Sequence, residues 1–161
     1  MLMLDPLSMT SVPLFPRFDQ MTLGVATGFF YKFNGATYLV SNWHVMSGRH
    51  PSSGQPLDKN GAVPNSLGLY LHKTTVGHFR RDAELPLIDS QGAPLWRQHG
   101  TKGQDVDIAV LQVPNIDPMF EIKLYCVNEQ DNESALAVRV GTDVFIVGFP
   151  KGLALQDILP I

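Results

Sequence analysis

The strongest constraint on the fold of this chain is a pair of apolar segments that flank Asn34-Gly35. Residues 22–33 are rich in Thr, Val, Phe and Tyr, which strands favour, and residues 36–42 continue in the same way. Asn-Gly favours a two-residue hairpin turn because both residues tolerate a positive φ angle. We therefore predict a β-hairpin that ends just before His44.

Further strand patterns follow this hairpin. Leu67, Leu69 and Leu71 alternate along one of them, whereas Gly, Pro, Ser, Asp and Asn dominate the loop-like stretch 47–63. The strands predicted after the hairpin are 66–73, 84–89, 94–98 and 106–113. About six strands with almost no helix are typical of a small antiparallel barrel, so we expect an all-β fold.

The N-terminal residues have a different pattern. Pro6, Pro13 and Pro16 stand among apolar residues. Proline fixes φ and lacks an amide donor, which disfavours a central strand. We therefore expect residues 1–19 to form an extended arm that lies on the core.

Composition narrows the class of protein. The chain has 161 residues, of which 44% are hydrophobic and 17% charged, as in a core-forming globular protein. This length accommodates one ordinary domain, or one complete small barrel and part of another. The formal charge of −3 argues against nucleic acid as the main partner, because phosphate binding needs a basic face. No apolar run approaches the roughly 18 residues of a membrane-spanning helix, so no membrane association is expected.

Cys126 is the only cysteine, so no intramolecular disulfide can form. The start of the chain has no basic region and places Asp5 and Pro6 within its apolar stretch, which does not fit a secretory signal. These two observations favour a reducing compartment, and we expect a cytoplasmic protein.

His44 and Asp107 are the residues that could carry chemistry. His44 follows an apolar strand, where its side chain can face a cleft, and Asp107 begins the apolar segment Asp-Ile-Ala-Val-Leu. A carboxylate beside a buried strand needs a partner, and an imidazole N–H can supply one. Asp105 is a competing carboxylate on the same strand face, but Asp107 directly abuts the apolar run. The alternatives are a structural or exposed histidine and a solvated aspartate.

Four segments resemble the trypsin-like serine proteases. They are Ala26-Thr27-Gly28-Phe29-Phe30, Tyr38–Val45 around His44, Asp107–Leu111, and the stretch Val144–Gly152 that ends in Phe-Pro-Lys-Gly. Their order and content are most similar to the bacterial trypsin-like peptidases related to the HtrA (Deg) group. The resemblance implies a chymotrypsin-like antiparallel β-barrel fold, with the first barrel complete and the second only begun.

The resemblance also implies a division of the chain. A first barrel over 20–113 would carry His44 and Asp107, residues 114–137 would connect, and residues 138–161 would start a second barrel. The continuous apolar run 144–147 is expected to be a strand buried on both faces or covered by a partner. Strands in 138–149 would then lack their neighbours, so we expect possible self-association there.

The function implied is peptide-bond hydrolysis of a protein or peptide substrate by a Ser-His-Asp triad. His44 would act as general base and then general acid, and Asp107 would orient it. The nucleophile is missing, because the family places it in a Gly-x-Ser-Gly setting. Only Ser47 and Ser53 precede a glycine, and neither has a glycine two residues earlier. We therefore expect an N-terminal portion of a protease, inactive on its own.

Other readings remain open. Cys126 could in principle replace the serine, although a small buried hydrophobe is the simpler interpretation. The histidines, His44, His50, His72, His78 and His99, show no metal-ligand spacing, and we expect neither metal nor cofactor. The alternative function is a non-catalytic, protease-derived barrel that binds peptides or protein partners.

Overall fold

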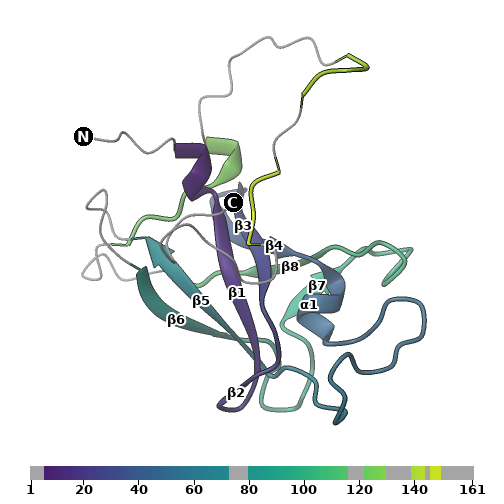
Figure 1. Ribbon diagram of the computed structural model, residues 1–161. Coiled ribbons are helices and arrows are strands. Elements are labelled where there is room, and N and C mark those ends of the chain that lie inside the picture. Colours follow the sequence, from purple (N-terminus) through teal and green to yellow (C-terminus); the bar gives the residue numbers. More distant parts are fainter. Residues whose placement is uncertain (1–5, 73–79, 116–121, 130–138, 144–145, 150–161) are drawn as a thin grey trace.

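A computed structural model describes residues 6–72, 80–115, 122–129, 139–143 and 146–149. The fold is all-β and antiparallel, with one short helix (Figure 1). The strands are β1 (Ser11–Phe18), β2 (Met21–Thr22), β3 (Ala26–Phe33), β4 (Ala36–Ser41), β5 (Ser66–His72), β6 (Arg80–Pro86), β7 (Trp96–Gln98) and β8 (Ala109–Gln112). The helix α1 is Trp43–Ser47, and two 3-10 turns lie at Pro6–Met9 and Val127–Glu129.

The strands form one eight-stranded sheet in the order β6-β5-β1-β3-β4-β8-β7, with β2 paired to β1. This sheet curls until the continuations of its two edge strands meet. The Leu95 amide donates to the Leu87 carbonyl at 3.0 Å, and Ile88 bridges to Pro94. The curl follows from the right-handed twist of strands and encloses a single apolar interior.

The β3–β4 hairpin is confirmed. Phe33 pairs with Ala36, and the turn residues Asn34 and Gly35 have φ angles of 47° and 77°. Two consecutive positive φ angles are what a type I′ turn requires, and Asn-Gly adopts them at low cost.

Residues 11–18 do not lie on the sheet as an arm but form β1 within it, between β3 and β5. Pro16 is tolerated because of where its missing amide falls. The Pro16 carbonyl accepts from the Leu23 amide at 2.8 Å, on the side away from β5. Since the N–H and C=O of a strand residue point to the same side, the ladder with β5 loses no donor at Pro16.

Several predicted strand limits also shift. Strand β6 covers 80–86, and β8 begins only at Ala109 because tight turns occupy the residues before it. The Asp105 amide donates to the Lys102 carbonyl at 3.0 Å, and the Ile108 amide to the Val106 carbonyl at 2.7 Å. Asp107 therefore lies in the turn that enters β8.

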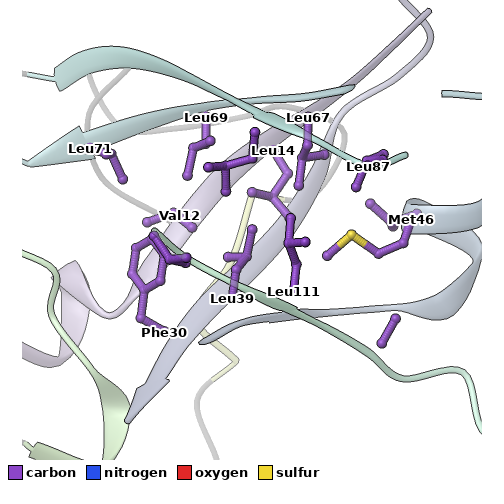
Figure 2. Packing of buried hydrophobic residues seen from close by; sticks show 14 of the residues in the cluster. Val12, Leu14, Phe30, Leu39, Met46, Leu67, Leu69, Leu71, Leu87 and Leu111 are labelled. Atoms are coloured by element: carbon purple, nitrogen blue, oxygen red, sulfur yellow. The ribbon is translucent and has the colours of Figure 1, made fainter. Parts of the chain in front are cut away.

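The core lies inside the curled sheet (Figure 2). Alternate residues of the strands point into it, and Leu14, Leu39 and Leu67 are fully buried. On the outer face of β3, by contrast, Phe29, Tyr31 and Phe33 are exposed. This period of two is the strand pattern that allows one face to be packed and the other to meet solvent.

The described residues of 139–149 contain no strand, which differs from the expectation of a buried strand at 144–147. Positions 144 and 145 lie outside the described residues, and Ile146 is 88% exposed. The Ser11 hydroxyl instead donates to the Val147 carbonyl at 3.1 Å, and the Phe149 amide donates to the Thr27 hydroxyl at 2.8 Å. These two hydrogen bonds attach residues 147–149 to the N-terminal ends of β1 and β3.

Within the described ranges, none of the helices has the length and apolar character needed to cross a bilayer. The division into 20–113, 114–137 and 138–161 stays a prediction.

The core assignment predicts a large difference between two substitutions on neighbouring strands. Leu14→Ala should lower the free energy of unfolding by about 2–5 kcal/mol, because it removes buried methyl groups and leaves a cavity. Phe33→Ala removes a larger side chain that is 59% exposed and should cost much less. Urea unfolding followed by circular dichroism measures both, and equal losses would contradict this packing.

Candidate active site

The pairing of β4 with β8 brings His44 and Asp107 together. Ser41, the last residue of β4, pairs with Ala109, the first residue of β8. In an antiparallel pair, residues that follow one strand run beside residues that precede the other. His44 lies three residues after Ser41 and Asp107 lies two before Ala109, so their side chains meet although they are 63 residues apart.

The first turn of α1 is anchored by Trp43. This side chain is buried, and its indole N–H donates to Gln98 Oε1 at 2.6 Å. It also packs edge-to-face on Trp96, with ring centroids 6.4 Å apart. Trp96 and Gln98 belong to β7, so the helix that carries His44 is attached to an edge of the sheet.

The end of α1 is fixed by Gly48. Its φ of 64° is left-handed, and its amide donates to the His44 carbonyl at 2.9 Å. A Cβ added at Gly48 would approach the Pro64 ring to 2.2 Å. Glycine therefore allows both the conformation that ends the helix and the close approach of the following loop.

Three hydrogen bonds converge on the Asp107 carboxylate. The His44 ring atom Nδ1 lies 2.7 Å from Oδ2, and the His44 backbone amide donates to Oδ1 at 2.9 Å. The Asn42 side-chain amide donates to Oδ2 at 3.1 Å and to the Asp107 backbone carbonyl at 3.2 Å. Both carboxylate oxygens are thus engaged by residues on either side of the β4–α1 junction.

This arrangement fixes the chemistry of the imidazole. Partial burial raises the pKa of Asp107, but the hydrogen bonds from His44 and Asn42 outweigh it, so the pKa lies below its ordinary value. An ionised carboxylate can only accept, so Nδ1 must carry the proton that faces Oδ2. In the neutral ring, Nε2 is then a free proton acceptor. The side chains of His44 and Asp107 are 37% and 36% exposed, so the imidazole is partly accessible to solvent.

A cavity of about 260 Å³ lies beside His44. It is lined by the segment between β2 and β3, with Leu23 and Val25, and by the loop that follows α1, with Leu57 and Pro64. The lining is mainly apolar, which suits a hydrophobic side chain of a ligand.

The other predicted candidates do not join the pair. Asp105 is exposed, and the carboxylate that reaches the imidazole is Asp107. The Ser47 hydroxyl accepts from the Arg49 amide, and the Ser53 hydroxyl accepts from the Gln55 amide. Among the described residues, no hydroxyl or thiol is hydrogen-bonded to His44 Nε2.

Cys126 belongs to the core. It is buried, its backbone forms an isolated β-bridge with that of Phe30, and it packs in the same cluster as the interior leucines. Burial, followed by the neighbouring Glu129, raises the pKa of its thiol. A buried thiol with a raised pKa is a poor nucleophile, which disfavours a catalytic role for Cys126.

The remaining histidines are dispersed. His50 and His99 each accept a local backbone amide through Nδ1, and His72 packs edge-to-face on Tyr125. Burial lowers the pKa of His72. His78 lies outside the described residues. In the described part of the chain, no group of three or more His, Cys, Asp or Glu side chains gathers as a metal site would require.

No family model, curated protein or solved structure matches this chain. The resemblance to trypsin-like proteases therefore rests on the motifs and stays a prediction. One residue of the site, Asn42, was absent from the sequence-based candidates. Its position directly before the helix indicates a cap, and only the β4–β8 register shows that its side chain turns toward Asp107 instead.

The pKa of Asp107 predicts a pH-dependent contribution to stability. Because the folded-state pKa is lowered, this contribution is present above the ordinary value of 3.8 and is lost as the pH falls through the folded-state value. The stability advantage of the wild type over Asp107→Asn should therefore shrink on acidification. Urea unfolding of both proteins from neutral pH to pH about 3 measures it. A difference that stays constant over this range would contradict the ionised, hydrogen-bonded carboxylate.

Proposed function

We propose that this chain carries the histidine and aspartate of a trypsin-like serine endopeptidase, on the first barrel of a chymotrypsin-like fold. The observation that supports it is the 2.7 Å contact between His44 Nδ1 and Asp107 Oδ2, with both carboxylate oxygens further hydrogen-bonded. An oriented, partly exposed imidazole with a free Nε2 is the general base that acyl transfer to a serine needs.

The chemical steps follow from this geometry. A serine hydroxyl placed at Nε2 would lose its proton to His44 as its oxygen attacks the peptide carbonyl. The imidazolium, stabilised by Asp107, would then return the proton to the leaving amine. The sequence contains no Gly-x-Ser-Gly stretch. In this proposal, the serine and the backbone amides of the oxyanion hole are supplied by a polypeptide segment other than these 161 residues.

The cavity beside His44 supports a peptide substrate. Its lining is mainly apolar and includes His44 together with residues of the β2–β3 segment. A hydrophobic side chain close to the bond being cut would fill it and position the substrate carbonyl.

The same cavity is the observation that favours the second candidate function, a binding module without catalysis. The described residues that line it, Leu23 and Leu57 among them, include no serine. A protease-derived barrel could thus bind an apolar peptide side chain there and release it uncut.

A serine-directed fluorophosphonate separates the two functions. We expect the product of the complete reading frame that contains this sequence to be labelled, and the 161-residue chain alone to remain unlabelled. His44→Ala should abolish labelling in the complete product. Asp107→Asn should slow it by about ten-thousand-fold, the scale found when this orienting carboxylate is lost in serine proteases.

Asp105→Asn is the matched control, because it removes a neighbouring exposed carboxylate that does not contact the imidazole, and it should label like the wild type. Labelling of the 161-residue chain would contradict the proposal. A reading frame that encodes no Gly-x-Ser-Gly stretch would reject the protease and leave the binding module.

A further inference from the structure

The side chain of Asn42 holds Asp107 by two acceptors at once. Its Nδ2 atom donates to the carboxylate oxygen Oδ2 at 3.1 Å and to the backbone carbonyl of the same residue at 3.2 Å. Both partners are acceptors, so the amide group must present its NH₂ side to them. Because the two hydrogens of one NH₂ group bind the backbone and the side chain of Asp107, they fix the rotamer of that side chain relative to its own main chain.

This use of Asn42 is unusual for its position. The residue stands immediately before α1, where an asparagine side chain normally accepts an amide from the first helical turn. Here the side chain makes no capping hydrogen bond, and only the Asn42 backbone carbonyl accepts from Val45 and Met46. The side-chain amide is therefore committed to Asp107 and not to the helix.

We propose that Asn42 is a positioning residue, whose amide fixes the Asp107 carboxylate in the orientation that receives the Nδ1–H of His44. The His44 backbone amide holds Oδ1 at 2.9 Å, and Asn42 holds Oδ2 from the other side. With both oxygens held, the carboxylate cannot rotate away from the imidazole without breaking two hydrogen bonds. The catalytic meaning of this role rests on the proposed function, whereas the role itself does not.

Electrostatics gives the measurable consequence. Burial raises the pKa of Asp107. The hydrogen-bond donors of His44 and Asn42 lower this pKa, because they stabilise the charged carboxylate. Removal of the Asn42 donor should therefore raise the pKa of Asp107. A role confined to helix capping would change stability but not this titration.

Two substitutions separate these roles, because serine and aspartate are both favoured at helix N-caps. Asn42→Ser removes the amide donor, and Asn42→Asp replaces it with a second carboxylate. We expect the titration of the Asp107 carboxyl carbon, followed by NMR in the 161-residue chain, to move to higher pH in Asn42→Ser and further still in Asn42→Asp. The Nδ1 proton of His44 should also exchange faster with water in both.

Asn128→Ala is the matched control. Asn128 is another exposed asparagine, and its side chain bonds the backbone of Lys32, on β3 and not at the site. We expect it to leave the Asp107 titration unchanged. A wild-type Asp107 midpoint in both Asn42 variants would overturn the proposal, and so would unfolding of both while Asn128→Ala folds. None of these readouts needs a nucleophile, so they succeed or fail separately from the fluorophosphonate labelling.

Discussion

The antiparallel register between β4 and β8 is the constraint on which the site depends. Ser41 opposite Ala109 fixes which residues face one another beyond the strand ends, and the contact between His44 and Asp107 follows from it. A slip of one residue would turn every side chain of β8 to the other face and remove Leu111 from the core. The packing of the interior therefore protects the geometry of the site, although the interacting side chains themselves are partly in solvent.

The His44–Asp107 pair contributes orientation more than stability. Ion pairs exposed to this degree are worth about 0–1 kcal/mol, whereas burial of a single leucine such as Leu39 is worth about 2–3 kcal/mol. Yet three donors engage the one carboxylate. Trp43 and Gly48 hold the short helix from its two ends, so a nearly rigid frame carries a side chain that solvent can reach. Rigid support of an accessible group is what a general base or a binding contact needs.

Sequence patterns were sufficient to predict a structural element where the physical cause of that element is local in the chain. Asn34-Gly35 predicts its hairpin because the turn demands positive φ angles from those two residues, and the apolar run after Asp107 locates the entry to β8. They failed where the cause lies in partners distant along the chain. Pro16 is compatible with the β1–β5 ladder because its carbonyl, and with it the place of its missing amide, faces Leu23 and not β5. Asn42 reaches Asp107 only through strand pairing, and Ile146, in an apolar run whose composition favours a buried strand, is exposed.

The position of the proton on the His44 imidazole is the measurement that tests the central claim most directly. Nitrogen-15 NMR of the histidine rings, at a pH where His44 is neutral, distinguishes protonation at Nδ1 from protonation at Nε2. A hydrogen bond from Nδ1 to Asp107 Oδ2 predicts that His44 is protonated at Nδ1, with an unprotonated Nε2, and that Asp107→Ala abolishes this preference. A wild-type His44 protonated at Nε2 would contradict the account.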